Sequence, residues 1–304
     1  MRQGSTRHII NVTPGLIGMR YTNQWSAFDR GASPQLIPFL GWARMQTAWA
    51  SFKLAQRASI PTHFVREEEC ALVVKEFTVV EADGSELPLI SGESHGTMIP
   101  LEWIYRVEVD GSLYDRLVSG KVDSAQYGIP NGTEIVRGMP LPHVLIECTT
   151  KREPVDRHLS DEEARDLAKL SMPEWMEARM IVGQLARVIN EGYRGAGFRV
   201  PDGKIELALD HHRNVIVVDT FGTQDENRII EIDTGALYSK DLIRNYLKKL
   251  RFYATLQEAK KKHPTEKGLW PSYPELPTEF VDQVSGAYVQ VANRYQQYVA
   301  SLLR

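Results

Sequence analysis

The sequence VIVVDTFGTQDENRI, residues 215–229, begins as a strand and ends in a polar run. Its first four residues are Val and Ile, which is typical of a strand buried on both faces. Such a strand normally stops in one or two turn residues, whereas Asp219 opens a stretch made almost entirely of polar side chains. A turn needs fewer polar groups, so the run predicts a loop that faces a ligand.

The preceding segment predicts a partner strand. KIELALD (204–210) and NVIVVDT (214–220) are separated by three residues, a pattern that indicates an antiparallel hairpin. Lys204 and Glu206 are two residues apart and share one face, with Asp219 near the end of the returning strand. Two carboxylates beside a lysine suit Mg²⁺ with a phosphorylated substrate. The alternative is a solvated hairpin face with a cross-strand ion pair.

Hydrophobic periodicity and turn residues predict an α+β chain of antiparallel sheets and flanking helices. A capping box at Ser160–Glu163 predicts a helix start, and the polar loop 82–98 is a candidate lid or insertion. The last helix has an apolar face that we expect to pack in the core, with a homo-oligomer contact as the alternative. We expect strands at 8–12, 16–22, 71–81, 101–109, 204–210 and 214–220, and helices at 41–58, from about 173 to 195, 239–261 and 277–303.

Composition excludes several classes of protein. None of the 304 residues belongs to a run apolar enough to cross a bilayer, and the first residues do not match a signal peptide. A formal charge of −3 with mixed signs argues against nucleic-acid binding. Two distant cysteines, Cys70 and Cys148, make neither a disulfide framework nor a zinc pattern. We expect a cytoplasmic enzyme with small-molecule substrates and no membrane partner.

Five parts of the chain, in order, are NQWSAFD (23–29), IPTHFV (60–65), PLEWIYRVEVDGSL (100–113), TTKREPVDRHLS (149–160) and the hairpin with its loop at 202–228. Together they resemble the SAICAR synthetase (phosphoribosylaminoimidazole-succinocarboxamide synthase) family. In the last of them, Asp202-Gly203-Lys204-Ile205-Glu206 resembles the family's Asp-x-Lys-x-Glu strand, and residues 219–228 resemble the Asp-Glu-x-x-x-Pro-Asp-Ser-Ser-Arg that follows it. The resemblance implies a two-lobed, ATP-grasp-like α+β fold. Residues 1–98 would form a β-rich nucleotide-binding lobe, and 99–304 an α+β lobe with the metal and substrate sites.

The family joins a carboxylate to the amine of L-aspartate with ATP, through an acyl phosphate. The resemblance implies ATP and Mg²⁺ here, with carboxyaminoimidazole ribonucleotide and L-aspartate as substrates. Lys204 and Asp219 would be catalytic, and Glu206 and Asp219 would hold the metal. The implied ATP-binding residues are Gly4, Ser5, Arg7, Lys75, Lys204 and Glu206. The implied substrate-binding residues are Asp29, Arg106, Ser112, Lys151, Asp156, Asp225 and Arg228.

Several departures fall at the substrate sites. The family's Gly-Lys-x-Lys/Arg is Gly-Ser-Thr-Arg at residues 4–7, and its Asp-Ser-Ser-Arg is Asp-Glu-Asn-Arg at 225–228. Glu226 would repel an anionic phosphate at close range. The departures leave two alternatives: a relative that ligates another carboxylate and amine in a specialised-metabolite or modified-nucleoside pathway, or a small-molecule phosphotransferase. A nucleotide-binding protein without catalytic activity is a third reading.

Overall fold

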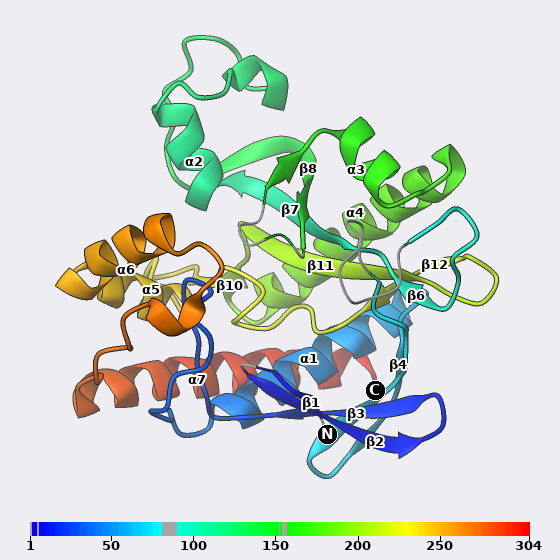
Figure 1. Ribbon diagram of the computed structural model, residues 1–304, viewed down its shortest axis with the longest axis horizontal. Helices are drawn as coiled ribbons and strands as arrows, with labels where there is room; N and C mark the ends of the chain where they lie inside the picture. Colours follow the sequence, from blue (N-terminus) through cyan, green and yellow to red (C-terminus); the bar gives the residue numbers. More distant parts are fainter. Residues whose placement is uncertain (1, 5, 81–89, 152, 154–156) are drawn as a thin grey trace.

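The computed structural model describes residues 2–4, 6–80, 90–151, 153 and 157–304. Two antiparallel sheets lie one above the other, and long helices cover them (Figure 1). The predicted α+β class is therefore confirmed.

The first sheet is built from the beginning of the chain. Its strand order is β1-β2-β3-β5-β4. The predicted hairpin is present: β2 and β3 pair antiparallel across a turn in which Gly15 has a φ of 78°, a left-handed conformation that favours glycine. The bounds are β1 Arg2–Gln3, β2 Arg7–Thr13, β3 Leu16–Tyr21, β4 Phe64–Glu68 and β5 Ala71–Lys75.

The second sheet carries the hairpin of the opening stretch. Its order is β12-β11-β7-β8-β9, and the short strand β6 also pairs with β11. Strand β11 is central, because it pairs with β7 at its beginning and with β12 at its end. The bounds are β6 Thr97–Met98, β7 Leu101–Val109, β8 Met139–Thr150, β9 His158–Leu159, β11 Asp202–Leu209 and β12 Val215–Val218.

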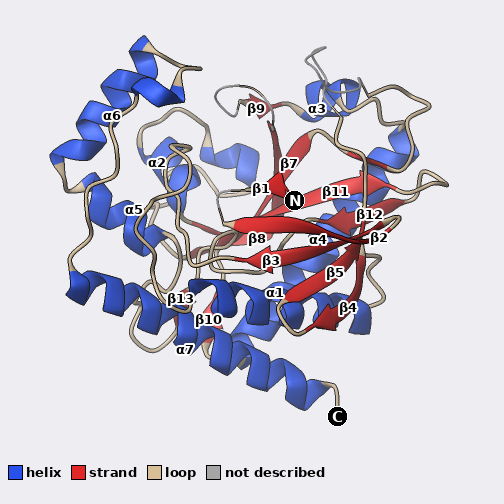
Figure 2. Ribbon diagram, turned by 60° about the horizontal axis from the view of Figure 1, so that its bottom comes forward, coloured by secondary structure: helices blue, strands red, loops and turns tan. Residues whose placement is uncertain are grey.

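Long helices cover the sheets (Figure 2). Helix α1 packs along α7, and α4 contacts β7, β8 and β12. Two helices begin with capping boxes, α3 at Ser160 as predicted and α4 at Ser171. The bounds are α1 Leu40–Arg57, α2 Gly111–Val118, α3 Asp161–Leu167, α4 Met172–Gly195, α5 Asp241–Lys248, α6 Arg251–Lys262 and α7 Thr278–Leu302; the minor elements are η1 Ser124–Tyr127, β10 Phe198–Arg199, β13 Ile230–Glu231 and η2 Lys267–Leu269.

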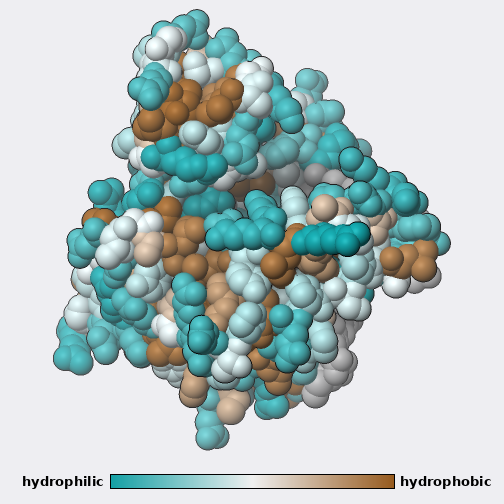
Figure 3. Space-filling view, turned by 90° about the vertical axis from the view of Figure 1, so that its left-hand side faces the viewer, coloured by the Kyte–Doolittle hydropathy of each residue, from teal (hydrophilic) through white to brown (hydrophobic). Residues whose placement is uncertain are grey.

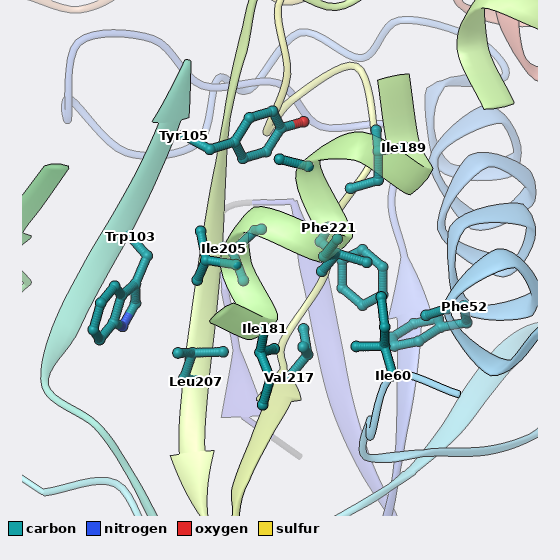
Figure 4. Close-up of a cluster of buried hydrophobic side chains, with 14 of the residues drawn as sticks. Phe52, Ile60, Trp103, Tyr105, Ile181, Ile189, Ile205, Leu207, Val217 and Phe221 are labelled. Carbon is teal, nitrogen blue, oxygen red and sulfur yellow. The ribbon is translucent and has the colours of Figure 1, made fainter. Parts of the chain in front are cut away.

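One apolar core joins the sheets and helices (Figure 4). Phe52 of α1 packs against Phe221, which lies in the loop after β12, with ring centroids 4.7 Å apart. Trp103 of β7 stacks near Trp175 of α4 at 4.9 Å. Each such fully buried side chain contributes about 1.5–3 kcal/mol of transfer free energy. The core thus holds the end of β12 rigidly beside α1.

Three predicted elements differ in the structure. The strand expected at 71–81 ends at Lys75. The helix expected at 239–261 is two helices, because Leu250 is extended, with φ −95° and ψ 152°. The loop 82–98 contains β6, and residues 81–89 lie outside the described part of the chain. Among the longer elements, strands β4 and β8 and helix α2 were not predicted. The apolar face of α7 packs in the core, as expected, through Val284, Tyr288, Val291 and Tyr295.

A short segment links the two sheets. Residues 61–63 run parallel to the outer edge of β12, where the His63 N–H donates to the Val217 carbonyl at 3.0 Å. The Val217 N–H donates to the Pro61 carbonyl at 2.9 Å. The segment continues into β4 of the first sheet. The end of β12 is therefore fixed relative to both sheets.

Candidate active site

Strand β11 delivers Lys204 and Glu206 to one side of the second sheet, as predicted. The Lys204 Nζ lies 3.7 Å from the Glu206 Oε1. The same ammonium is 2.8 Å from Glu102 and 3.5 Å from Glu226. Burial by itself lowers the pKa of Lys204, but the surrounding carboxylates, Glu226 and Glu102 first, raise it above its usual range. Lys204 is therefore held as a cation.

Asp219 leaves the end of β12 in an unusual backbone conformation. Its φ is 58°, in the left-handed region, which breaks the alternation of side chains along the strand. Glu206 pairs with Val218, the last residue of β12, and both Glu206 and Asp219 line one cavity. The two carboxylates therefore converge on one cavity, as predicted.

Asp219 is paired with a cation from the first sheet. The Arg7 guanidinium contacts both carboxylate oxygens, with one hydrogen bond at 2.9 Å. Burial by itself raises the pKa of Asp219, but Arg7, Lys151 and Lys204 bring it well below its usual range. Asp219 is therefore ionised at neutral pH.

The cavity lies between the two sheets and has a volume of about 930 Å³. Its apolar walls come from both sheets and from residues 76–79. Arg7, Lys151, Glu206 and Asp219 meet in one region of it, which we call the charged end, and Lys75 and Glu76 line the cavity as well. A cavity with apolar walls and a few convergent charged groups is typical of a ligand site.

Three of the predicted ATP-binding residues line this cavity besides Glu206: Gly4, Arg7 and Lys75. The Gly4 N–H donates to the Arg7 carbonyl at 2.8 Å, which closes a turn over the cavity. Ser5 lies outside the described residues. The structure therefore places the predicted glycine-containing turn beside the charged end of the cavity.

Lys151, predicted to bind substrate, also lines the cavity, and its ammonium contacts the Glu206 carboxylate. Asp156, predicted with it, lies outside the described residues. Glu206 and Asp219 thus each form an ion pair with a cation from another part of the chain.

Arg106, Ser112 and Arg228 form a second cluster, at the N-terminus of α2. The Arg106 Nη2 donates to the Ser112 Oγ at 3.0 Å. Arg106 and Arg228 both donate to one oxygen of Asp202, at 3.1 and 2.9 Å. Gly111 has no side chain to keep Arg228 away, since a Cβ there would lie 2.3 Å from its Nη1. These three residues, predicted to bind substrate, therefore do converge; we call them the arginine cluster.

The arginine cluster is buried and surrounded by carboxylates. Arg106 is 3% exposed and pairs with Glu147 at 2.7 Å, while Arg228 pairs with Asp241 at 2.9 Å. Burial raises the pKa of Asp202, and the two arginines partly offset that increase.

The segment 110–139, which contains α2, protrudes from the rest of the molecule, and apolar side chains gather on its surface (Figure 3).

The loop after Asp219 is only partly a ligand-facing loop, which corrects the interpretation of its polar run. Gln224 is fully buried and bonds to Thr47 and to the Tyr288 carbonyl, each at 3.0 Å. Asn227 is buried and accepts from Tyr105 at 2.8 Å. These groups have partners inside the protein because an unpaired buried polar group is costly. Glu226 remains facing a cavity.

Asp225, a predicted substrate ligand, is held inside the protein. It pairs with the Arg44 Nε at 2.9 Å and accepts from the Tyr288 hydroxyl at 2.7 Å. Asp29, another predicted ligand, lies apart from the described cavities; its side chain is 68% exposed and pairs with Lys260 at 3.1 Å. Substrate binding by either residue stays a prediction.

The sequence did not single out three residues of the site. The His63 Nε2–H donates to the Asp219 carbonyl, 3.2 Å away, and burial lowers the pKa of His63 to about 4. Arg44 is buried and donates to the carbonyls of Thr22 and Gln24 at 2.8 Å. Burial lowers the pKa of Lys240. His63 lies in the IPTHFV segment, so the resemblance to the family pointed to it. Arg44 lies in α1, where the apolar pattern of the helix gave no sign of a functional arginine.

The donors at the charged end fit a hard cation in type. Glu206 and Asp219 offer carboxylate oxygens to one cavity, which is what Mg²⁺ takes from protein when phosphates supply other ligands. In the part of the chain that the structure describes, no group of three or more His, Cys, Asp or Glu side chains is arranged to hold a metal. A two-carboxylate site shared with phosphates needs no third such group.

Comparison with known proteins decides the family. The SAICAR synthetase family model matches residues 1–260. The chain belongs to the SAICAR synthetase family. It is 32% identical over 281 residues to the phosphoribosylaminoimidazole-succinocarboxamide synthase of Thermoplasma acidophilum, covering 90% of this chain and 91% of that one. A relative from Archaeoglobus fulgidus, named as a putative enzyme of the same activity, is 31% identical over 92% of this chain and 88% of its own.

Solved structures of SAICAR synthetases share the fold. The SAICAR synthase of Saccharomyces cerevisiae, complexed with SAICAR, superposes with a TM-score of 0.71 at 17% identity, covering 97% of this chain and 94% of that chain. A SAICAR synthetase in complex with ADP gives 0.64 at 21% identity, covering 90% and 99%. The family fold and the class of ATP-dependent ligase are therefore confirmed for this chain. The comparisons do not support the alternatives of another ligated substrate or a phosphotransferase.

Within the described residues, no helix is long and apolar enough to cross a membrane.

Proposed function

We propose that this chain joins carboxyaminoimidazole ribonucleotide to the amino group of L-aspartate, with ATP converted to ADP, and releases SAICAR. The observation that carries the proposal is the course of β11, which begins at the arginine cluster with Asp202 and reaches the charged end of the cavity at Glu206. One strand thus connects a candidate phosphate site with a candidate nucleotide site. The substrates are small molecules, and the proposed location is the cytoplasm.

The cavity is the proposed ATP site. Its volume of about 930 Å³ and its apolar walls suit a nucleotide base, with the phosphates at the charged end. Gly4 and Arg7 form a turn over that end, and Lys75 lines the wall. That a solved relative binds ADP supports this assignment.

The arginine cluster is the proposed site of the ribonucleotide phosphate. Two planar guanidinium groups, a hydroxyl and the N-terminus of α2 converge there, and each is a favourable donor to an anion. From Asp202 to Glu206 the strand rises about 13 Å, at about 3.3 Å per residue. An elongated acceptor with its phosphate on the cluster would therefore present its far end near Lys204.

The proposed chemistry begins with transfer of the γ-phosphoryl group of ATP to the acceptor carboxylate. The oxygen of that carboxylate forms the new P–O bond, and ADP leaves. Lys204 is placed to stabilise the charge that accumulates on the transferring group. A Mg²⁺ ion on Glu206 and Asp219 would supply further charge neutralisation on the phosphates, with Lys151 and Arg7 giving up part of their present contacts.

The second proposed step is attack of the aspartate amine on the acyl phosphate. The nitrogen lone pair forms the amide C–N bond, and the C–O bond to phosphate breaks as phosphate departs. The amine must lose its extra proton before it attacks, so the site needs a group that binds an ammonium and can accept that proton.

The test is an assay of purified protein with Mg·ATP, L-aspartate and carboxyaminoimidazole ribonucleotide, followed by mass spectrometry. Appearance of SAICAR with an equal amount of ADP supports the proposal. A parallel reaction with hydroxylamine in place of aspartate should yield a hydroxamate of the acceptor, because hydroxylamine traps acyl phosphates. No SAICAR and no hydroxamate, with ATP bound, would reject the proposed acceptor.

A further inference from the structure

Glu226 stands where the family pattern has a small hydroxyl residue, and its surroundings are unlike those of the other carboxylates in the site. The side chain is 18% exposed. It lines a small cavity between the loop 220–226, the first sheet and α1. The other lining residues are Thr6, Arg7, Tyr21, Arg44, Thr220, Thr223 and Asp225.

The other carboxylates near Glu226 are already matched by cations. Asp225 has Arg44 at 2.9 Å, Asp219 has Arg7, and Glu206 has Lys151. Among the described residues, Glu226 forms an ion pair with Lys204 alone, at 3.5 Å, and Lys204 has a shorter contact of 2.8 Å with Glu102. Glu226 and Glu102 thus share one ammonium, so this group of charges can attract a further cation.

Arg7 and Arg44, which line the small cavity, make their direct contacts with other groups. Arg7 is held by Asp219 and by the Thr220 hydroxyl. Arg44 is held by Asp225 and by two backbone carbonyls. An anionic substrate group beside Glu226 would be repelled, whereas a cationic group would be attracted.

The size and lining of the cavity fit one ammonium group. Its volume of about 10 Å³ corresponds to a single sphere the size of a water molecule. The hydroxyls of Tyr21 and Thr220 lie 2.9 Å apart on its wall, so oxygen acceptors are present besides the carboxylate. An ammonium donates three hydrogen bonds and accepts none, which matches this set of groups.

We propose that Glu226 binds the ammonium group of the amino-acid substrate in this cavity, and so determines that the second substrate is a primary amine carried as a cation. The inference rests on the proposed ligase reaction, whose second step needs such a site. Glu226 then touches the substrate directly, while Lys204 acts on the phosphorylated acceptor. The substituted glutamate is in this view a recognition residue for the amine.

The test compares two nucleophiles in the variant Glu226→Gln, which keeps the shape and removes the charge. L-Aspartate carries an ammonium, whereas hydroxylamine is uncharged at neutral pH and does not need the ion pair. We expect the KM for L-aspartate to rise roughly 10- to 100-fold, as for the loss of one charge-assisted hydrogen bond. Hydroxamate formation from Mg·ATP and the acceptor should stay within about twofold of the wild-type rate. Glu226→Asp, which keeps the charge, should recover part of the affinity for aspartate.

Glu102→Gln is the matched control, because it removes the shorter of the two ion pairs to Lys204 and leaves the small cavity unchanged. We expect it to slow hydroxamate formation while the KM for aspartate changes little. An unchanged KM for aspartate in Glu226→Gln would overturn the inference. Equal loss of both reactions in Glu226→Gln would also overturn it, since Glu226 would then act through Lys204. Failure of the proposed function itself is distinguishable, because the wild type would then form no hydroxamate.

Discussion

Protonation of His63 should make the protein less stable in mild acid. The imidazole is 4% exposed, and burial lowers its pKa from 6.5 to about 4. The folded state therefore favours neutral His63, so its contribution is fully present above pH 6.5 and is lost as the pH falls toward 4. The contribution lost over that whole interval is about 3 kcal/mol, at about 1.4 kcal/mol per pH unit.

The magnitude at a practical pH follows from the same two values. Between about pH 7 and about pH 4.5, the loss assigned to His63 is about 2 kcal/mol. For a chain of this size that corresponds to a decrease in the melting temperature of about 3 °C. Glutamine at this position keeps an N–H donor for the Asp219 carbonyl, which His63 contacts at 3.2 Å, and cannot take up a proton.

The assay is thermal unfolding, followed by intrinsic fluorescence, of the wild type and His63→Gln at the two pH values. We expect the wild type to lose about 3 °C more than the variant on acidification. His212→Gln is the control, because His212 is exposed at the tip of the β11–β12 hairpin and its substitution should leave the wild-type difference unchanged. Equal acid sensitivity of the wild type and His63→Gln would refute the reasoning.

Three further substitutions test the site and its frame. Asp219→Asn should lower turnover by about 100-fold or more, the size typical of losing one electrostatic group at a reacting centre. It should also lower the melting temperature, because Asn tolerates the left-handed backbone but leaves the Arg7 guanidinium without its carboxylate. An ADP-release assay with a thermal melt checks both, and full activity would reject the assignment. Arg228→Met should raise the KM for the ribonucleotide roughly tenfold or more and leave the KM for ATP unchanged. Steady-state kinetics with each substrate varied measures both constants, and an equal rise in the KM for ATP would contradict a separate phosphate site. Gly203→Ala should lower the free energy of unfolding by roughly 1–3 kcal/mol, because a Cβ would lie 1.8 Å from the Asn227 Oδ1 and 2.5 Å from the Tyr105 hydroxyl. Urea unfolding measures this free energy, and an unchanged value would show that the loop carrying Asn227 can move away.

The hairpin and the face it presents could be predicted from sequence because alternation along a strand is a local property. Lys204 and Glu206 had to share a face once 204–210 was a strand, and the structure places them 3.7 Å apart at their charged atoms. The left-handed conformation of Asp219 could not be predicted, because alternation along a strand predicts an extended backbone there and few residues other than glycine adopt a positive φ.

The meaning of the polar run was harder to predict. Polar residues in a loop can face a ligand or satisfy one another inside the protein, and composition does not distinguish the two. Gln224 and Asn227 have buried partners on α1, α7 and β7 that lie far away in the sequence. The partners of the arginine cluster were unpredictable for the same reason, since Asp202 and Asp241 reach Arg228 only through the fold. The resemblance located these residues, whereas their ion pairs required the structure.

The segment 61–63 along β12 also protects the protein from self-association. Strand β12 lies at the end of its sheet, and its sequence, four consecutive Val and Ile residues, is the kind that pairs readily with another chain when its backbone groups are unpaired. The carbonyl of Pro61 and the N–H of His63 occupy the Val217 backbone groups that an intruding strand would use. The same few residues that contact the end of β12 and the Asp219 carbonyl thus close this edge of the second sheet, so the position of Asp219 and the protection of the edge depend on one short segment.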